Sequence, residues 1–244
     1  MNGKMSDLLR NLSPVRWAII IVCILTVPLY YFMRAGLRAN QAMYAGITCV
    51  MQLKNVGRGM SQYAQDNDGM LPAVNRPAVG ATWKTDIMPY VQFKPAFACP
   101  AREWSTLDKN GLPISYAVNT AGVGRTTGNR GPFAPSSKPI NVNRFANAAQ
   151  VIAVCEVQNT SSPGFDIDDP FFGPKRQVLF AAYHGLTNVL YLDGHANSLL
   201  PHETAHGSAR YDLRPTNMWY IDGAKPLSAN GAQILAATEA AFPK

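Results

Sequence analysis

The stretch Trp17–Met33, WAIIIVCILTVPLYYFM, carries no charged residue, and the rest of the chain is organised around it. As an α-helix it reaches about 25 Å, which is the short end of a bilayer span. Trp17 stands at one end and Tyr30 and Tyr31 at the other, where amphipathic rings prefer the headgroup level. The stretch therefore predicts a transmembrane helix at residues 17–33, preceded by a short segment at residues 1–16.

Two other interpretations fit an apolar run near the amino terminus, a cleaved signal peptide and a buried core helix. The run is followed by Arg34 and Arg38, with no clean small-x-small cleavage site directly after it. We therefore favour an uncleaved anchor. The simplest topology has the short amino terminus in the cytoplasm and a large head outside it.

The following segment, residues 34–68, predicts an amphipathic helical stem that continues the span without a helix breaker. Its apolar residues recur every three or four positions, which places them on one helical stripe. The pattern ends at Asp66-Asn67-Asp68-Gly69, and Pro72 follows. The residues expected to pack this stem onto the head are Val50, Leu53, Val56, Met60 and Tyr63.

Residues 69–244 predict a β-rich head with a few short helices. Apolar runs at residues 114–118 and 151–157 read as strands, the second fully buried. Asp193-Gly194 joins two further apolar runs and predicts a hairpin with a type I′ turn. Helices are expected near residues 83–90 and 229–241, the latter capped by Ser228.

The composition excludes one class of partner. Of the 244 residues 47% are hydrophobic and only 15% are charged, so the chain can bury a core. The formal net charge is +7, but the basic residues are scattered and form no run or aromatic-interleaved patch. We therefore expect no nucleic-acid partner.

Four cysteines occur, and two of them can meet. Cys23 lies in the apolar span and Cys155 in a buried strand, where each reads as a small apolar residue. Outside the cytoplasm, Cys49 and Cys99 can form a disulfide, which in the chain-entropy model stabilises the fold by about 4 kcal/mol. The alternative is two unpaired buried thiols.

Several motifs together resemble the bacterial type IV pilin-like and type II secretion pseudopilin-like proteins, in particular the subgroup with a carboxy-terminal His-x9-Asp-Gly motif. The similarity covers roughly residues 40–200. It rests on Cys49 to Gly57, on Tyr63-Ala64-Gln65-Asp66-Asn67-Asp68-Gly69-x-Leu71-Pro72, on Phe97-x-Cys99-Pro100, on Ser115-Tyr116-x-x-Asn119 and on His184 with Asp193-Gly194.

The resemblance implies an α+β, pilin-like fold, in which the second half of a long amino-terminal helix packs on an antiparallel β-sheet. The span predicts membrane lipid as a partner, and the resemblance implies other copies of this chain or pilin-like subunits and components of a secretion machine. Two features differ from the family. His184 is one residue closer to Asp193 than in the motif, and no Gly-Phe-Thr-Leu-Ile-Glu type of processing site precedes the apolar run.

Two groups of residues are candidate metal ligands. No cofactor is expected, although Asp166, Asp168 and Asp169 offer hard oxygen donors that suit calcium. Related secretion pseudopilins hold calcium in a carboxylate-rich loop. His195, His202 and His206 offer imidazoles to a transition metal, and the alternative is that they are solvated loop histidines.

The sequence favours a non-enzymatic, membrane-anchored structural or interaction protein. No nucleophile elbow, zinc-protease helix, phosphate-binding loop or dinucleotide fingerprint is present. A second hypothesis is a tethered metal-binding hydrolase or ligand-binding domain that uses the histidine region. A third is an adhesin-like head that binds sugars through Trp83, Trp104 and Trp219.

Overall fold

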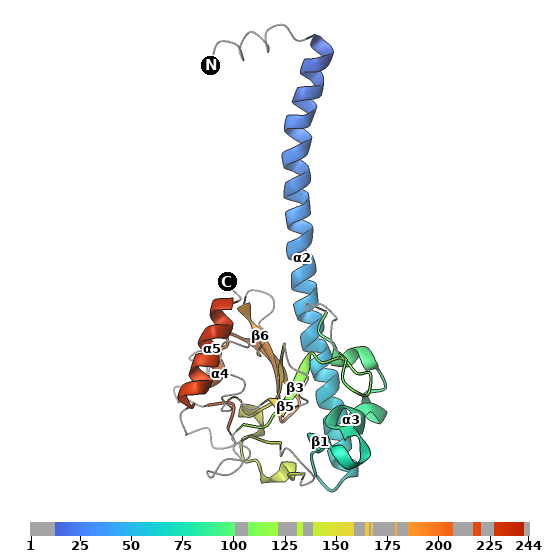
Figure 1. The fold of residues 1–244 in the computed structure, drawn as a ribbon, viewed down its shortest axis with the longest axis vertical. Helices are drawn as coiled ribbons and strands as arrows, with labels where there is room; N and C mark the ends of the chain where they lie inside the picture. Colours follow the sequence, from blue (N-terminus) through green and yellow to red (C-terminus); the bar gives the residue numbers. More distant parts are fainter. Residues whose placement is uncertain are drawn as a thin grey trace. The chain divides into compact units, whose positions relative to one another are not determined.

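A computed structural model describes residues 13–100, 107–121, 131–133, 139–158, 164–165, 167, 179, 185–206, 217–220 and 227–241, without the side chains of residues 39, 42 and 206. It divides into two compact units, Met1–Met43 and Tyr44–Lys244. Helix α2, Pro14–Asp66, supplies the described part of the first unit and the beginning of the second (Figure 1).

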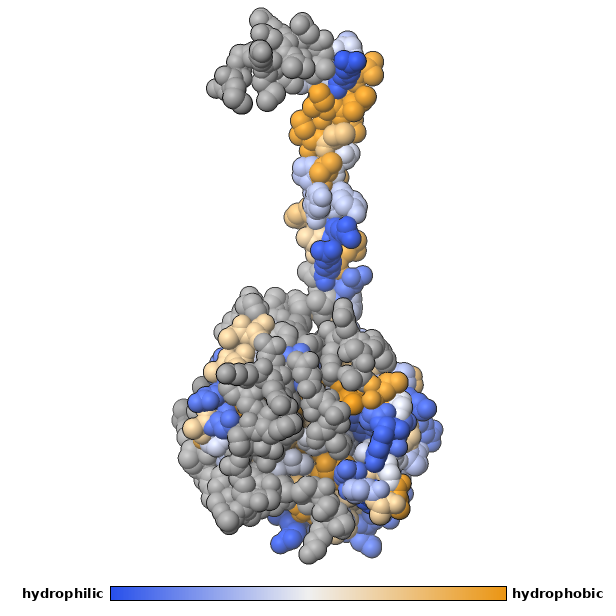
Figure 2. Space-filling view, in the orientation of Figure 1, coloured by the Kyte–Doolittle hydropathy of each residue, from blue (hydrophilic) through white to orange (hydrophobic). Residues whose placement is uncertain are grey.

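In the first unit, the apolar residues of α2 are exposed. Figure 2 shows them as an orange surface, and none of the most apolar part of the helix is buried. Within the described residues, this is the one helix long and apolar enough to cross a membrane. Its complete exposure disagrees with the buried core helix considered above, whereas an anchor and a signal sequence both remain compatible with it.

The second unit contains a five-stranded sheet with the order β5-β3-β4-β6-β7. Its strands are β3 (Tyr116–Asn119), β4 (Ile152–Glu156), β5 (Gly164–Phe165), β6 (Thr187–Tyr191) and β7 (Ala196–Leu199). The pairs β3–β4, β4–β6 and β6–β7 are antiparallel, but β5 runs parallel to β3. The expected wholly antiparallel sheet is therefore corrected to a mixed one. The chain reverses once after β4, so β5 runs in the direction of β3.

Each face of this sheet buries its own apolar core. Tyr116, Val118 and Leu190 point to the face that α2 covers with Cys49, Leu53, Val56 and Met60. Their neighbours along the strands, including Ala117, Val189 and Tyr191, point to the other face. That face is covered by Met218–Tyr220 and by helix α5, Ala229–Ala241 (Figure 1). The alternation follows from the two-residue period of a strand.

The β-bulge in β4 explains the one exception to this alternation. Ala153 and Val154 are consecutive, yet both belong to the core beneath α2, whereas Ile152 belongs to the opposite core. The pairing of β4 with β6 shifts register between Ile152 and Val154. An extra residue in one strand shifts the alternation of side chains beyond it by one position.

The β6–β7 hairpin is present, but its turn differs from the expected type. Type I′ needs a positive φ at both central residues, whereas here only Gly194 has one, at 91°. The Gly194 N–H donates to the Tyr191 carbonyl at 3.0 Å, and the Tyr191 N–H donates to the His195 carbonyl at 2.9 Å. The loop is therefore a turn followed by a left-handed glycine, a common longer hairpin connection.

Short elements complete the second unit. Strands β1 (Asn75–Arg76) and β2 (Ala81–Thr82) form a two-stranded ribbon that leads into α3, Trp83–Val91. Helix α4 spans Glu203–His206. The 3-10 helices are η1 (Pro77–Val79), η2 (Lys94–Phe97), η3 (Val142–Arg144) and η4 (Ala148–Gln150). Ser228 caps α5 as expected, because its Oγ accepts the Gly231 N–H at 3.1 Å.

Candidate functional site

A disulfide fastens α2 to the head. Cys49 and Cys99 are bonded, their Cα atoms lie 4.8 Å apart, and both residues are fully buried. Cys49 faces inward because the helical spacing puts it on the stripe that contains Leu53 and Val56. The predicted pairing is therefore confirmed, and the alternative of two unpaired thiols is wrong.

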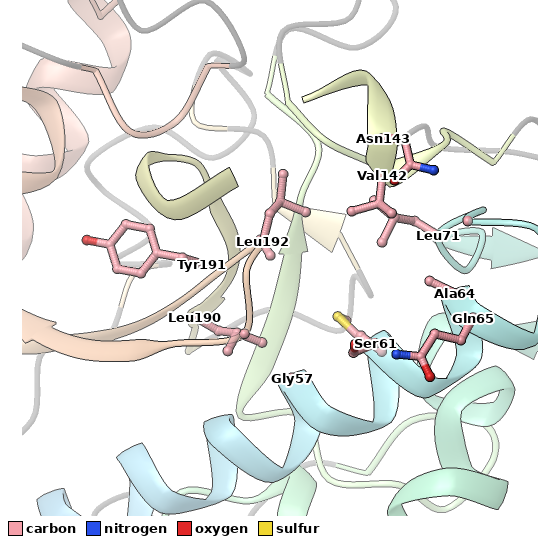
Figure 3. Close-up of a pocket in the computed structure, with 14 residues that line it drawn as sticks. Gly57, Ser61, Ala64, Gln65, Leu71, Val142, Asn143, Leu190, Tyr191 and Leu192 are labelled. Carbon is pink, nitrogen blue, oxygen red and sulfur yellow. The ribbon is translucent and has the colours of Figure 1, made fainter. Parts of the chain in front are cut away.

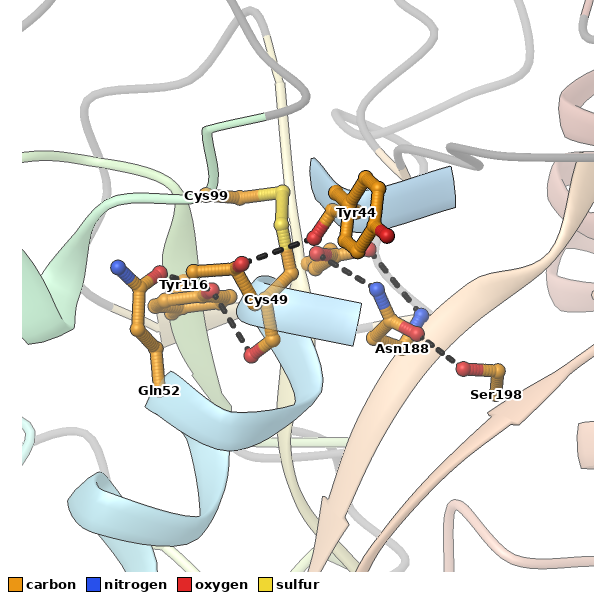
Figure 4. The surroundings of a disulfide bond; sticks show 9 residues. Tyr44, Cys49, Gln52, Cys99, Tyr116, Asn188 and Ser198 are labelled. Carbon is orange, nitrogen blue, oxygen red and sulfur yellow. Dashed lines mark hydrogen bonds between the residues drawn. A yellow bond between two sulfur atoms is a disulfide. The ribbon is translucent and has the colours of Figure 1, made fainter. Parts of the chain in front are cut away.

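Beside the disulfide lies a buried carboxylate that the sequence did not single out. Glu156 ends β4 and is 0% exposed. Its two carboxylate oxygens accept hydrogen bonds from the Asn188 backbone N–H at 3.1 Å and from Asn188 Nδ2 at 3.0 Å. The Asn188 Oδ1 in turn accepts a hydrogen bond from Ser198 Oγ (Figure 4). Both oxygens of this buried side chain therefore have hydrogen-bond partners, as buried polar groups require.

The same buried polar cluster includes a tyrosine under α2. The Tyr116 hydroxyl donates to the Cys49 carbonyl at 3.3 Å and lies 3.5 Å from Gln52 Oε1 (Figure 4). Burial, with a smaller contribution from the Glu156 charge, raises the pKa of Tyr116 well above its usual value. Polar contacts therefore join α2 to β3 and β4 to β6, while the disulfide joins α2 to the segment after η2.

This cluster is the one group in the described part of the chain with three possible metal-ligating side chains. One ligand atom from each of Cys49, Cys99 and Glu156 falls within 4.8 Å of the other two. Zinc and other soft-ligand metals bind cysteine as the thiolate. Because both sulfurs form the disulfide, the arrangement shown is a covalent crosslink beside a carboxylate.

The second feature of the head is a cavity of about 360 Å³ between α2 and the turn of the β6–β7 hairpin. Figure 3 shows Leu190 and Leu192 on one side of it, with Leu71 and Val142 opposite and Ala64 on the helix. Besides Tyr191, whose ring points away from the cavity in Figure 3, the polar side chains of the lining are those of Ser61, Gln65 and Asn143, and all three are exposed. None of the lining residues carries a charge at neutral pH.

The histidines of the predicted transition-metal site have separate partners. His195 Nδ1 lies 2.6 Å from Asp193 Oδ1, and its ring stacks on Tyr191 with centroids 4.1 Å apart. His202 Nδ1 lies 2.5 Å from Glu239 Oε1 on α5. The side chain of His206 lies outside the described residues. The described side chains therefore show two imidazole–carboxylate pairs, each using a different carboxylate, and no joint site.

The other predicted site residues are divided between described and undescribed parts of the chain. The calcium candidates Asp166, Asp168 and Asp169, the motif residue His184 and Trp104 lie outside the described residues. Asp193 and Gly194 form the hairpin turn. Trp83 and Trp219 are 0% exposed, so neither offers a sugar-binding surface. Two of the three tryptophans named in the adhesin hypothesis are therefore unable to contact a sugar.

The stem residues differ in burial. Leu53 and Val56 are 0% exposed and Met60 is 5% exposed, whereas Val50 and Tyr63 are half-buried at the edges of the stripe. Cys155 is also fully buried, and burial raises the pKa of its thiol, which keeps it protonated. It is therefore a core thiol, as expected, with no reactive thiolate.

Glu156 and Asn188 are the polar residues that sequence reasoning missed. Glu156 directly follows the apolar run 151–155, and Asn188 begins another apolar run. A charge or amide that continues a buried strand is a signal of a buried polar pair, because such groups enter a core only with partners.

Comparison with known proteins identified no relative. No family model matches the chain, and neither a curated protein nor a solved structure matches it.

Proposed function

We propose that this protein is a single-pass, membrane-anchored, pilin-like structural or interaction protein whose head lies outside the cytoplasm and is not an enzyme. The observation that carries the proposal is that the two parts of α2 differ in the exposure of their apolar side chains. Its first part presents apolar side chains on all sides, and its last part buries one stripe beneath a sheet. A chain of this design can hold a folded head at a membrane surface.

The disulfide supports a head outside the cytoplasm, and the cavity lining supports the proposal that the protein is not an enzyme. Structural disulfides form and persist in oxidising compartments, which favours an extracytoplasmic head. The lining of the cavity offers no charged acid or base for catalysis among the described residues. Self-association, pilin-like partners and a link to type II secretion are part of the proposal through the resemblance alone.

The anchor is tested with one substitution and a matched control on the same helix. Ile24→Arg puts a charge near the middle of the apolar stretch and disfavours insertion by about 3 kcal/mol, or roughly a hundredfold. Ile47→Arg makes the same change at an exposed position in the head unit. We expect the wild type and Ile47→Arg to stay in carbonate-washed membranes and Ile24→Arg to be partly released. Wild-type protein found free of membranes, without its first thirty or so residues, would contradict the anchor.

The interaction role and the orientation have separate readouts. A photo-crosslinking amino acid at Met51, which is 60% exposed, samples neighbours of the stem in the native membrane. The same group at fully buried Leu53 is the control, because it contacts the chain's own sheet. We expect adducts to a second copy or to another pilin-like protein at Met51 only.

External protease should digest the head in spheroplasts, and a protected head would refute the orientation.

A further inference from the structure

The cavity beside α2 adjoins a glycine that allows the helix to approach the hairpin closely. A Cβ atom at Gly57 would lie 2.8 Å from Leu190 Cδ1 and 3.2 Å from the Gly194 carbonyl oxygen. The helix therefore touches the hairpin at Gly57. The small side chains of Ser61 and Ala64, one and two turns further on, leave the cavity unfilled (Figure 3).

The walls of the cavity are held by the fold before any ligand arrives. Leu71, Leu190 and Ala153 are buried residues of the core beneath α2. The Leu71 N–H donates to the Ile140 carbonyl at 2.9 Å, and the Leu192 N–H donates to the Val151 carbonyl at 3.1 Å. At about 360 Å³ the cavity falls within the size range of small-molecule sites, which are largely preformed.

The chemistry of the lining selects the kind of ligand. The interior is aliphatic, and the exposed polar groups at the rim are the Ser61 hydroxyl and the amides of Gln65 and Asn143. No carboxylate, ammonium, guanidinium or imidazole lines the cavity, although the chain as a whole has a formal charge of +7. A charged group placed there would lose its hydration without gaining an opposite charge.

We propose that this cavity binds a compact, uncharged ligand that is apolar over most of its surface and carries a neutral hydrogen-bonding group. The aliphatic walls Leu71, Leu190 and Leu192 take its apolar part. Ser61, Gln65 and Asn143 meet its polar group at the rim. This binding function goes beyond the anchoring role and does not depend on it, since every residue of the site belongs to the head unit.

The test uses the full chain in a neutral detergent and two photoreactive probes with the same skeleton. Benzophenone is uncharged, whereas benzophenone-4-carboxylate adds one negative charge. After irradiation, mass spectrometry of peptides locates the adducts. We expect saturable benzophenone adducts on residues 57–71 and 190–194, and about tenfold fewer with the carboxylate, because an unpaired buried charge is disfavoured by at least that factor.

Two tryptophan variants on neighbouring helix positions separate the cavity from the surface. Ser61→Trp fills the mouth, while Gln62→Trp adds the same ring at an exposed position outside the lining. Asn143→Trp closes the mouth from the opposite wall, in case Ser61→Trp disturbs the helix. An intact Cys49–Cys99 disulfide, read from the mass after alkylation, reports correct folding in each variant.

The outcomes decide the proposal in both directions. Loss of the cavity adducts in Ser61→Trp and Asn143→Trp, with retention in Gln62→Trp, supports a ligand site. Equal labelling in all three variants, equal labelling by the two probes, or adducts confined to the apolar span would each overturn it. Because the span is present in every variant, its labelling serves as the internal standard.

Discussion

The two faces of the five-stranded sheet are covered in different ways. On one face α2 contributes a continuous stripe of buried residues and the Cys49–Cys99 disulfide. On the other, α5 packs through Ile234 and Leu235 beside Trp219, and no disulfide joins the described residues of that face. The comparison teaches that the face joined to the predicted anchor is also the covalently reinforced one.

This difference has a mechanical meaning under the proposed function. A force that acts on the head through the anchor reaches the sheet by way of α2. Cys49 is the first buried residue along α2 among the described side chains, so the disulfide lies at the start of the buried part of the helix. A covalent bond at that point ties the helix to the segment after η2 and so resists its separation from the head.

The largest expected effect comes from removing this reinforcement. Cys99→Ser deletes a crosslink between residues 50 positions apart, which the chain-entropy model values at about 4 kcal/mol of unfolding free energy. Cys23→Ser, at an exposed position in the apolar stretch, is the control and should leave the head unchanged. Urea unfolding of the full chain in detergent measures both. A Cys99→Ser head as stable as wild type would remove the distinction between the two faces.

A somewhat smaller effect is expected from the apolar stripe itself. Leu53 is 0% exposed and packs in the core beneath α2, so Leu53→Ala should lower the unfolding free energy by about 3 kcal/mol. Ile47 lies on the same helix but is 50% exposed, and Ile47→Ala should change it by less than about 0.5 kcal/mol. Equal costs at the two positions would mean that the stripe does not hold α2 on the sheet.

The α2 face was largely predictable from sequence because its signals are local. Leu53, Val56 and Met60 recur at helical spacing, and Cys49 lies on the same stripe as a possible partner for Cys99. Hydrophobic periodicity identifies such a helix without knowledge of the sheet. The strands near residues 116 and 152 were also predicted, because each is a short apolar run.

The other face depends on contacts that no local pattern encodes. Asn119 Nδ2 donates to the Ile152 carbonyl at 2.9 Å and to the Trp219 carbonyl at 2.8 Å, which joins three distant segments. In the sequence, residues 218–221 are an apolar piece within a stretch that otherwise resembles a loop, yet Trp219 is fully buried and its Nε1 donates to Thr204 Oγ1 at 2.9 Å. The cavity could not be predicted either, because it depends on the small size of Gly57 and Ala64, and no sequence pattern shows which space a small residue leaves empty.

The smallest expected effect probes the α5 face through pH. Tyr191 lies in that core, and its hydroxyl donates to Met218 Sδ at 3.2 Å. Burial, assisted by the charges of Asp193 and Glu203, raises its pKa to about 12. Unfolded tyrosine ionises near pH 10, so between pH 10 and 12 the unfolded state binds fewer protons than the folded state. Stability that is fully present below pH 10 is therefore lost as the pH rises through this window.

Tyr191→Phe removes this pH dependence while keeping the ring. The unfolding free energy of the variant minus that of the wild type should rise by about 1.4 kcal/mol from pH 9 to pH 11, because one pKa unit corresponds to that energy. Tyr44→Phe changes an exposed tyrosine and is the control. Comparing variants at each pH by urea unfolding cancels the titration of the remaining groups, including buried Tyr116 on the α2 face. A constant difference between wild type and Tyr191→Phe across this range would show that the α5 face opens to water before the head unfolds.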